Sequence, residues 1–177
     1  MDKTIAKENL KCYYKITNDN SFNCVLIYGT LLGFKRESDF ISYDEDIDIG
    51  LPASERLRWE RLIHLFKKEG FEVMRSDRDL ISLSRNGEYI DTYFFRPFLW
   101  YYINHRQIIQ RNYILDVEQG LFQGIEVYIP KETISFLQSH YGSDWMTPKQ
   151  NQPGKSTDTI FGIVKKLLRR ILLNQNY

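Results

Sequence analysis

The stretch YGTLLGFKRESDFISYDEDIDIG, residues 28–50, joins a small-residue turn to a crowded acidic segment. Four acids lie within five positions near its end: Asp44, Glu45, Asp46 and Asp48. Carboxylates that lie this close repel one another, and the repulsion costs stability. The crowding therefore indicates a function that requires several negatively charged oxygen atoms in one place.

Acids and isoleucines alternate from residue 46 to residue 51, which is the period of a half-buried strand. On a strand, Asp46 and Asp48 project from one face, whereas Ile47 and Ile49 point into the core. Two neighbouring carboxylates are disfavoured unless a cation sits between them, and oxygen ligands suit Mg²⁺ or Mn²⁺. Asp91 is the candidate for a third ligand, because it stands alone in the apolar run EYIDTYFF.

Two other interpretations of the acidic segment agree less well with its residues. A solvated acidic edge does not explain the interleaved isoleucines. A calcium-binding loop would place Asp44, Asp46 and Asp48 at its positions 1, 3 and 5 and Glu55 at position 12. Position 6 of such a loop must be Gly for its sharp turn, but Ile49 stands there. The sequence therefore favours a Mg²⁺ or Mn²⁺ site.

Gly29 and Thr30 follow the apolar run VLIY and precede a short predicted helix. Glycine lets the backbone approach a ligand closely, and free amides at a helix start favour phosphate. Arg36, just after this turn, is a candidate for bidentate contact with phosphate. A small-residue turn that precedes an acid-x-acid strand is the layout of the nucleotidyltransferase fold.

The rest of the chain alternates predicted strands and helices, and Asn86-Gly87 signals a hairpin. Predicted helices cover residues 3–16, 30–34, 54–69 and 130–140. Predicted strands cover residues 25–28, 46–51, 71–74, 80–84, 89–95 and 124–129, while residues 100–114 are not assigned. This order predicts an α/β (α+β) fold, a mixed sheet flanked by helices.

Composition narrows the class of protein. The chain has 177 residues, 42% of them hydrophobic, which suits one globular domain rather than a disordered chain. The formal net charge of +1 gives no general attraction to nucleic acid, so no nucleic-acid partner is expected. The polar N-terminal stretch and two widely spaced cysteines, expected to be reduced, predict a cytoplasmic protein.

A boundary is predicted near residue 150. Residues 1–150 are assigned to the catalytic domain, and residues 151–177 to a polar linker and a final helix over about 159–173. Apolar residues from Ile160 to Leu172 share one face of that helix, whereas lysines and arginines share the other. Such a helix either packs on the domain or lies on an anionic membrane, where it would make the protein peripheral at the inner face.

Residues 28–50 resemble the signature of the LicD/fukutin family, which runs roughly G-T-L-L-G, a basic residue, then F-I-P-W-D-x-D-I-D-I-G. A second stretch, LFQGIEVYIPKETISFLQSHYGSDWMTP at residues 121–148, is similar to the family's later block. The two blocks come in the family's order and spacing. Tyr43 and Ser42 replace the usual Trp and Pro, and the loop after Pro148 lacks the histidines that many members carry.

The resemblance implies a nucleotidyltransferase-type core with its metal on Asp46 and Asp48, and Asp91 matches the third acid. Gly29 and Thr30 would touch the phosphates of the donor. Members move a phospho-substituent, phosphocholine in bacteria or a polyol phosphate in the fukutin branch, from a cytidine diphospho-alcohol to a glycan hydroxyl. The acceptor would be a cell-surface glycan or its lipid-linked precursor. Asp91 would hold a metal or take the proton of that hydroxyl.

Two further functions stay open from the sequence. One is a nucleotidyltransferase that moves a nucleoside monophosphate from a triphosphate to a small molecule, because its metal chemistry is the same. The other is a binding module that has kept the fold without catalysis. The intact acids Asp46, Asp48 and Asp91 argue against the second, because a dead site has no reason to keep like charges crowded.

Overall fold

The computed structural model describes residues 1–104 and 107–148. The predicted linker and final helix, residues 151–177, lie outside the described residues, so the predicted domain boundary and membrane contact stay predictions. Among the described residues, no helix has the length and apolar character needed to cross a membrane.

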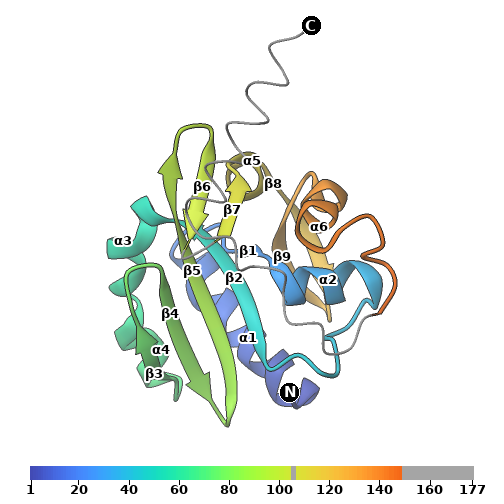
Figure 1. The fold of residues 1–177 in the computed structure, drawn as a ribbon. Coiled ribbons are helices and arrows are strands. Elements are labelled where there is room, and N and C mark those ends of the chain that lie inside the picture. The colour runs from blue at the N-terminus through green and yellow to red at the C-terminus, as the bar shows by residue number, and fades with distance from the viewer. Residues whose placement is uncertain (105–106, 149–177) are drawn as a thin grey trace, which may run out of the picture.

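A mixed sheet forms the framework, and its strand order is β3-β4-β5-β2-β1-β9-β8 (Figure 1). β6 lies outside this order and pairs with both β5 and β7. The pairs β2–β5 and β1–β9 are parallel, and the other pairs are antiparallel. The strands are β1 Val25–Leu26, β2 Asp46–Pro52, β3 Glu72–Ser76, β4 Leu80–Arg85, β5 Glu88–Phe98, β6 Tyr101–Asn104, β7 Gln107–Gln110, β8 Val117–Phe122 and β9 Ile125–Pro130.

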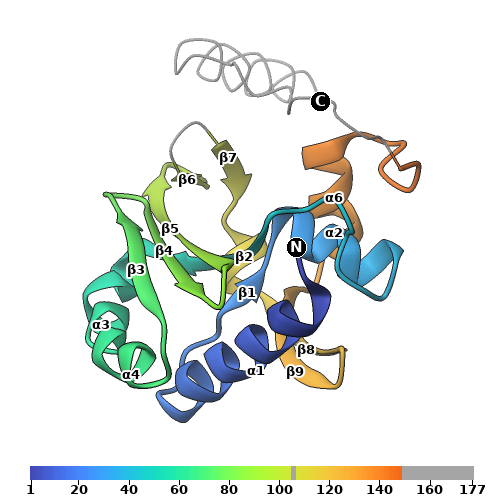
Figure 2. The same cartoon turned by 90° about the horizontal axis from the view of Figure 1, so that it is seen from below.

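The helices pack on both sides of this sheet. Figure 2 shows α1 and α4 on one side, and α6 and β7 on the other. The helices are α1 Lys3–Asp19, α2 Tyr28–Arg36, the 3₁₀ turn η1 Ala53–Glu55, α3 Arg56–Glu60, α4 Ile63–Lys68, α5 Asn112–Leu115 and α6 Thr133–Tyr141. The predicted α/β (α+β) class is therefore confirmed.

The predicted helix over residues 54–69 is wrong as a single element, because the chain forms η1, α3 and α4 instead. The break changes the buried face. Leu57, an apolar residue of the predicted helix, is 74% exposed, whereas Trp59 is fully buried. Trp59 packs between Phe66 and Phe94, with ring centroids 5.3 and 5.8 Å away. Burial of this large ring determines which face of α3 packs on the core, and the helical periodicity of the sequence does not reveal that face.

Residues 100–114, unassigned from the sequence, contain β6, β7 and α5. β8 was also missed. It lies at the sheet edge and is mostly exposed, so it lacks the apolar alternation of a half-buried strand. Gln123 and Gly124 turn the chain between β8 and β9 with positive φ values of 54° and 79°. The predicted strand 124–129 is β9.

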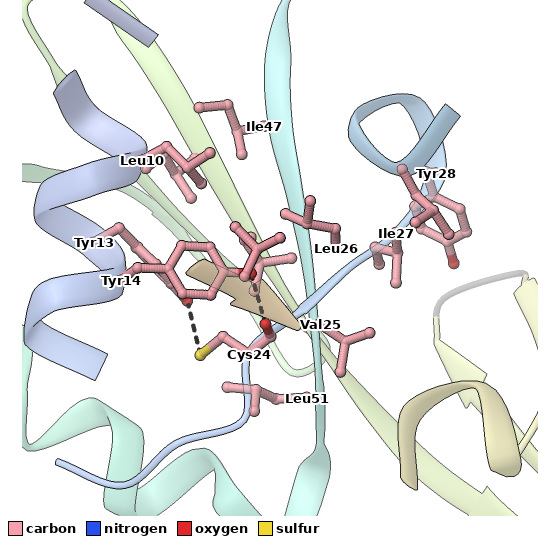
Figure 3. Packing of buried hydrophobic residues seen from close by; sticks show 14 of the residues in the cluster. Leu10, Tyr13, Tyr14, Cys24, Val25, Leu26, Ile27, Tyr28, Ile47 and Leu51 are labelled. Atoms are coloured by element: carbon pink, nitrogen blue, oxygen red, sulfur yellow. Dashed lines mark hydrogen bonds between the residues drawn. The ribbon is translucent and has the colours of Figure 1, made fainter. Parts of the chain in front are cut away.

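The core between α1 and the sheet decides which way β2 faces. Figure 3 shows Tyr13 and Tyr14 reaching from α1 toward Cys24 at the start of β1. The Tyr14 hydroxyl donates to the Cys24 carbonyl oxygen at 2.7 Å, and the Tyr13 and Thr92 hydroxyls lie 2.9 Å apart. Ile47 of β2 is fully buried on this side. The acids of β2 must therefore face the opposite side of the sheet.

Candidate functional site

Three carboxylates meet on that opposite side. Asp48 of β2 lies directly beside Asp91 of β5 in the parallel register, and Asp46 lies two residues earlier on the same face. Residues 46–52 form an extended strand rather than a loop, which excludes the calcium-loop interpretation. The structure thus brings together the three acids that the sequence singled out, although they are 45 residues apart in the chain (91 − 46).

The start of α2 holds Asp48 from two directions. The Gly29 amide donates to Asp48 Oδ2 at 3.0 Å, and the Asp48 amide donates to Thr30 Oγ1 at 2.8 Å. A Cβ atom on Gly29 would lie 2.1 Å from Asp44 Oδ2. Glycine at this position leaves room for the Asp44 carboxylate close to the backbone.

Burial and mutual repulsion raise the pKa values of Asp46 and Asp48. Burial, followed by the charges of Asp46, Asp44 and Asp91, raises the pKa of Asp48 well above its usual value. Burial, followed by the charge of Asp91, raises the pKa of Asp46 to about 6. Both shifts mean that the folded protein resists carrying all of these negative charges at once. A cation bound among the carboxylates would relieve that resistance.

Ser82 supports the third carboxylate and was missed from the sequence. It lies opposite Asp91 in the β4–β5 register and donates a hydrogen bond to Asp91 Oδ1 at 2.5 Å. Burial raises the pKa of Asp91, and the Ser82 hydrogen bond partly offsets this rise. Only the strand register identifies Ser82, because a serine in a strand carries no signal of its own.

A cavity of about 520 Å³ opens above Asp46 and Asp48. Its lining residues are Tyr28, Gly29, Asp44, Asp46, Asp48, Tyr93, Asn104, Gln107, His140 and Tyr141. Acids of β2 therefore form one part of the cavity, and aromatic and amide side chains form the rest. The aromatic and amide residues come from α2, β5, β6, β7 and α6. Most of them belong to no motif that would have identified them from the sequence.

His140 brings no positive charge to this cavity at neutral pH. Burial lowers its pKa to about 4. Its ring lies 4.7 Å from the Tyr28 ring and 6.2 Å from the Phe136 ring, centroid to centroid. His140 therefore acts as a neutral, packed member of the cavity wall.

Two predicted phosphate-binding residues do not line the cavity. Thr30 is 2% exposed, and its hydroxyl is engaged by the Asp48 amide. The Arg36 guanidinium pairs with Glu37 at 2.6 Å and reaches the Trp145 carbonyl oxygen and the Tyr43 hydroxyl. Phosphate binding by Thr30 and Arg36 stays a prediction, as does that by Gly29, which does line the cavity.

The donor set fits a hard divalent cation, because the acids offer only oxygen atoms. Asp46, Asp48 and Asp91 would hold it. Within residues 1–104 and 107–148, however, no three His, Cys, Asp or Glu side chains are already arranged around a common metal position. The carboxylates would therefore have to turn toward the ion when it binds, and metal binding stays a prediction.

Two solved structures share this fold. The crystal structure of ANT(2'')-Ia in complex with adenylyl-2''-tobramycin aligns with a TM-score of 0.57 over 98% of this chain and 99% of that chain. The solution structure of the antibiotic-resistance factor ANT(2'')-Ia aligns with a TM-score of 0.58 over 99% and 94%. Both are 15% identical to this chain, so the likeness shows the fold alone. It confirms the nucleotidyltransferase-like sheet.

Two relatives are similar to this chain over most of its length. The mouse protein named ribitol-5-phosphate transferase FKTN is 26% identical over 165 residues, which are 86% of this chain and 35% of that protein. An uncharacterized protein of Rickettsia typhi is 23% identical over 138 residues, 75% of this chain and 44% of that protein. This chain therefore spans less than half the length of either relative.

The model of the LicD/FKTN/FKRP nucleotidyltransferase domain matches residues 21–132. That segment includes Gly29 at the start of α2, all three carboxylates, the strands β2 and β5 that carry them, and β1. More than half of the chain is covered. The chain belongs to the LicD/FKTN/FKRP family.

Proposed function

We propose that this chain is a metal-dependent transferase that moves an alcohol phosphate from a cytidine diphospho-alcohol to a hydroxyl of a glycan. The observation that carries the proposal is the convergence of Asp46, Asp48 and Asp91, of which Asp46 and Asp48 line a cavity large enough for a small ligand. Family membership and the name of the mouse relative, ribitol-5-phosphate transferase FKTN, support it. The acceptor would be a cell-surface glycan or its lipid-linked precursor, and the alcohol either choline or a polyol.

The reaction would be an in-line displacement at the phosphorus that carries the alcohol. The acceptor oxygen forms the new P–O bond while the bond to the cytidine monophosphate oxygen breaks, and cytidine monophosphate leaves with the electron pair. A bound Mg²⁺ or Mn²⁺ would neutralise the charge that builds on the phosphate oxygens. Asp46 and Asp48 would hold the metal, and Asp91 would hold it too or accept the acceptor's proton.

Hydrogen bonds to Asp48 and Asp91 support this assignment of roles. Gly29 holds the carboxylate of Asp48, and Thr30 holds its backbone amide, so α2 determines the position of Asp48. Ser82 orients Asp91. Asp48 and Asp91 are thus each positioned by an element other than their own strand, and such support is what keeps metal-binding carboxylates in place.

Thermal melting with Mn²⁺ and a panel of nucleotides tests the proposal. The panel contains the cytidine diphosphate esters of choline, ethanolamine, glycerol and ribitol, together with the four nucleoside triphosphates. A ligand that binds only the folded state raises Tm. We expect a metal-dependent rise with at least one cytidine diphospho-alcohol.

Other outcomes would redirect the assignment. A rise with triphosphates alone would favour the nucleotidyltransferase that transfers a nucleoside monophosphate to a small molecule, because both reactions use the same carboxylates. No rise with any nucleotide in the presence of Mn²⁺ would favour a binding module. Product analysis by ³¹P NMR, with cytidine monophosphate as the expected leaving group, separates the two transferases.

A further inference from the structure

Two polar atoms in the cavity wall are buried without a hydrogen-bond partner among the described residues. They are the Tyr28 hydroxyl oxygen and Asn104 Oδ1, and both residues line the cavity beside Asp46 and Asp48. Leaving a buried polar group unpaired costs about 1–3 kcal/mol. Two such groups at one wall indicate that the wall is complete only when a ligand supplies the missing partners.

The orientation of the Asn104 amide is fixed by its other atom. Asn104 Nδ2 donates to the Asp79 carbonyl oxygen at 2.6 Å and to the Phe94 carbonyl oxygen at 3.2 Å. A flipped amide would place Oδ1 against two carbonyl oxygens, which repel it. Asn104 Oδ1 can therefore only accept a hydrogen bond, so its missing partner must be an O–H or N–H donor.

Tyr28 is held in a strained conformation that places its ring in this wall. Its backbone has φ 44°, in the left-handed region that an aromatic residue rarely adopts. Its ring packs edge-on against Tyr93, with centroids 5.5 Å apart, and also contacts His140 and Phe136. These rings occupy the sides of the Tyr28 ring, so the group that it has left for a ligand is its hydroxyl.

The hydrogen-bonding capacity of the two atoms, rather than the charge around them, favours a hydroxyl-bearing ligand group. His140, Gln107 and Tyr141 are uncharged neighbours in the lining, whereas Asp44, Asp46 and Asp48 bring carboxylates to the same cavity. Hydroxyl groups can donate to Asn104 Oδ1 and exchange a hydrogen bond with the Tyr28 hydroxyl. A trimethylammonium group has no hydrogen to donate and would leave both atoms unpaired.

From this geometry we infer that Tyr28 and Asn104 form a subsite for the hydroxyls of the transferred alcohol, so that the donor carries a polyol rather than choline. The inference rests on the proposed function, since it names the alcohol of that same donor. Neither atom is open to solvent in this structure. The half-buried Gln107, the cross-strand partner of Asn104, also lines the cavity, and a ligand reaches the two atoms only when lining side chains shift.

Tyr28→Phe tests the subsite without removing a contact from the fold. The hydroxyl that it deletes has no partner, so we expect Tm to stay unchanged or to rise. Tyr14→Phe is the matched control: it deletes the hydroxyl that donates to the Cys24 carbonyl oxygen, outside the cavity. We expect Tyr14→Phe to lower Tm and to leave nucleotide affinity as it is.

The readout is the Kd of the full chain for CDP-ribitol and CDP-choline with Mn²⁺, measured by calorimetry without an acceptor. The two donors share the cytidine diphosphate, so their difference reports the alcohol alone. We expect wild type to bind CDP-ribitol more tightly, and Tyr28→Phe to weaken CDP-ribitol about 5- to 10-fold while CDP-choline is unaffected. Because no acceptor is present, an acceptor sugar cannot produce this difference.

Three other results are distinguishable. Equal weakening of both donors would place the Tyr28 contact on the cytidine diphosphate and overturn the polyol subsite. Unchanged affinity for both would overturn it as well, because the two atoms would then be satisfied by water. If wild type binds neither donor, the proposed function fails, whereas tight and equal binding of both keeps that function and overturns only the subsite.

Discussion

The proposed metal-binding role of Asp48 requires a negative charge, whereas the stability of the fold disfavours that charge. It is 6% exposed, yet it lies beside Asp91 and near Asp46 and Asp44. Burial and like charges raise its pKa, so the ionised form is unfavourable in the folded protein. A buried acid with a pKa raised in this way is a candidate for a functional role rather than a stabilising one.

Asp48→Asn should therefore separate stability from activity. The amide oxygen can still accept the Gly29 hydrogen bond, and the buried charge disappears, so we expect an unchanged or higher Tm at pH 7. Transferase activity should fall by about 100-fold or more, because the metal loses a ligand. Mn²⁺ should raise Tm for wild type but not for Asp48→Asn. Full activity in the folded variant would contradict the three-acid site.

Asp46 gives a pH prediction. Its folded-state pKa, about 6, lies above the ordinary value of 3.8, so the folded protein takes up a proton that the unfolded chain does not. Its contribution to stability is thus present below about pH 4 and is lost as pH rises through 6. Asp46→Asn should accordingly be more stable than wild type at pH 7.5 without metal, and this advantage should shrink as pH falls toward 4.

The prediction compares Asp46→Asn with wild type because His140 changes the stability of the protein with pH in the opposite direction. Its pKa is lowered from 6.5 to about 4, so its contribution is present above pH 6.5 and is lost as pH falls through 4. Subtracting the wild-type Tm from the Asp46→Asn Tm at each pH cancels that contribution. A difference that stays constant from pH 4 to 7.5 would mean that Asp46 has an ordinary pKa.

At the scale of elements, α2 connects the acids to the rest of the fold. Its first residues fix Asp48, and its middle packs closely on the segment that leads to β2. A Cβ atom on Gly33 would lie 2.5 Å from the Asp39 backbone oxygen, which cannot move aside cheaply. The two glycines of the GTLLG motif therefore meet different neighbours: a carboxylate at Gly29 and the backbone at Gly33.

This difference predicts opposite consequences for two alanine substitutions. Gly33→Ala should lower the free energy of unfolding by about 2 kcal/mol, because backbone must shift to admit the methyl group. Gly29→Ala should fold, since the Asp44 side chain can swing away, but the displaced carboxylate should reduce activity. Urea denaturation and the transferase assay measure the two effects. An active Gly29→Ala protein would show that the position of Asp44 is unimportant.

Residues outside the segment that matches the family model complete the whole molecule. α1 precedes that segment and α6 follows it, at Lys3–Asp19 and Thr133–Tyr141. α1 fills the core with Tyr13 and Tyr14, whereas α6 buries Phe136 and Leu137 completely. α6 also brings His140 and Tyr141 to the cavity. The acids of β2 and β5 therefore depend on helices that the family match does not include.

A fragment of residues 21–132 should not fold by itself. It lacks at least four large buried side chains, and deleting one such side chain costs about 2–5 kcal/mol, so the loss approaches or exceeds the 5–15 kcal/mol stability of a typical domain. We expect the full chain to melt cooperatively by circular dichroism and the fragment to show no thermal transition. A cooperative transition in the fragment would mean that α1 and α6 are accessory to the fold.

The sequence by itself determined the acidic face, the mixed α/β class and the family resemblance. These follow from local patterns: the two-residue period of DIDIG sets which side chains share a face, and the turn at Gly29 is read from adjacent residues. The same reasoning failed for residues 54–69, where burial of Trp59 overrides helical periodicity, and for the exposed edge strand β8.

Only the tertiary structure decided what surrounds the acids. The register between β2 and β5 sets Asp48 beside Asp91, and the register between β4 and β5 adds Ser82. Tyr28, Asn104 and His140 meet at one cavity although they are far apart in the chain. Their meeting follows from strand pairing and helix packing, which bring distant segments together through burial of apolar surface. No local pattern encodes such a meeting, because each side chain acquires its role from neighbours that are remote in the sequence.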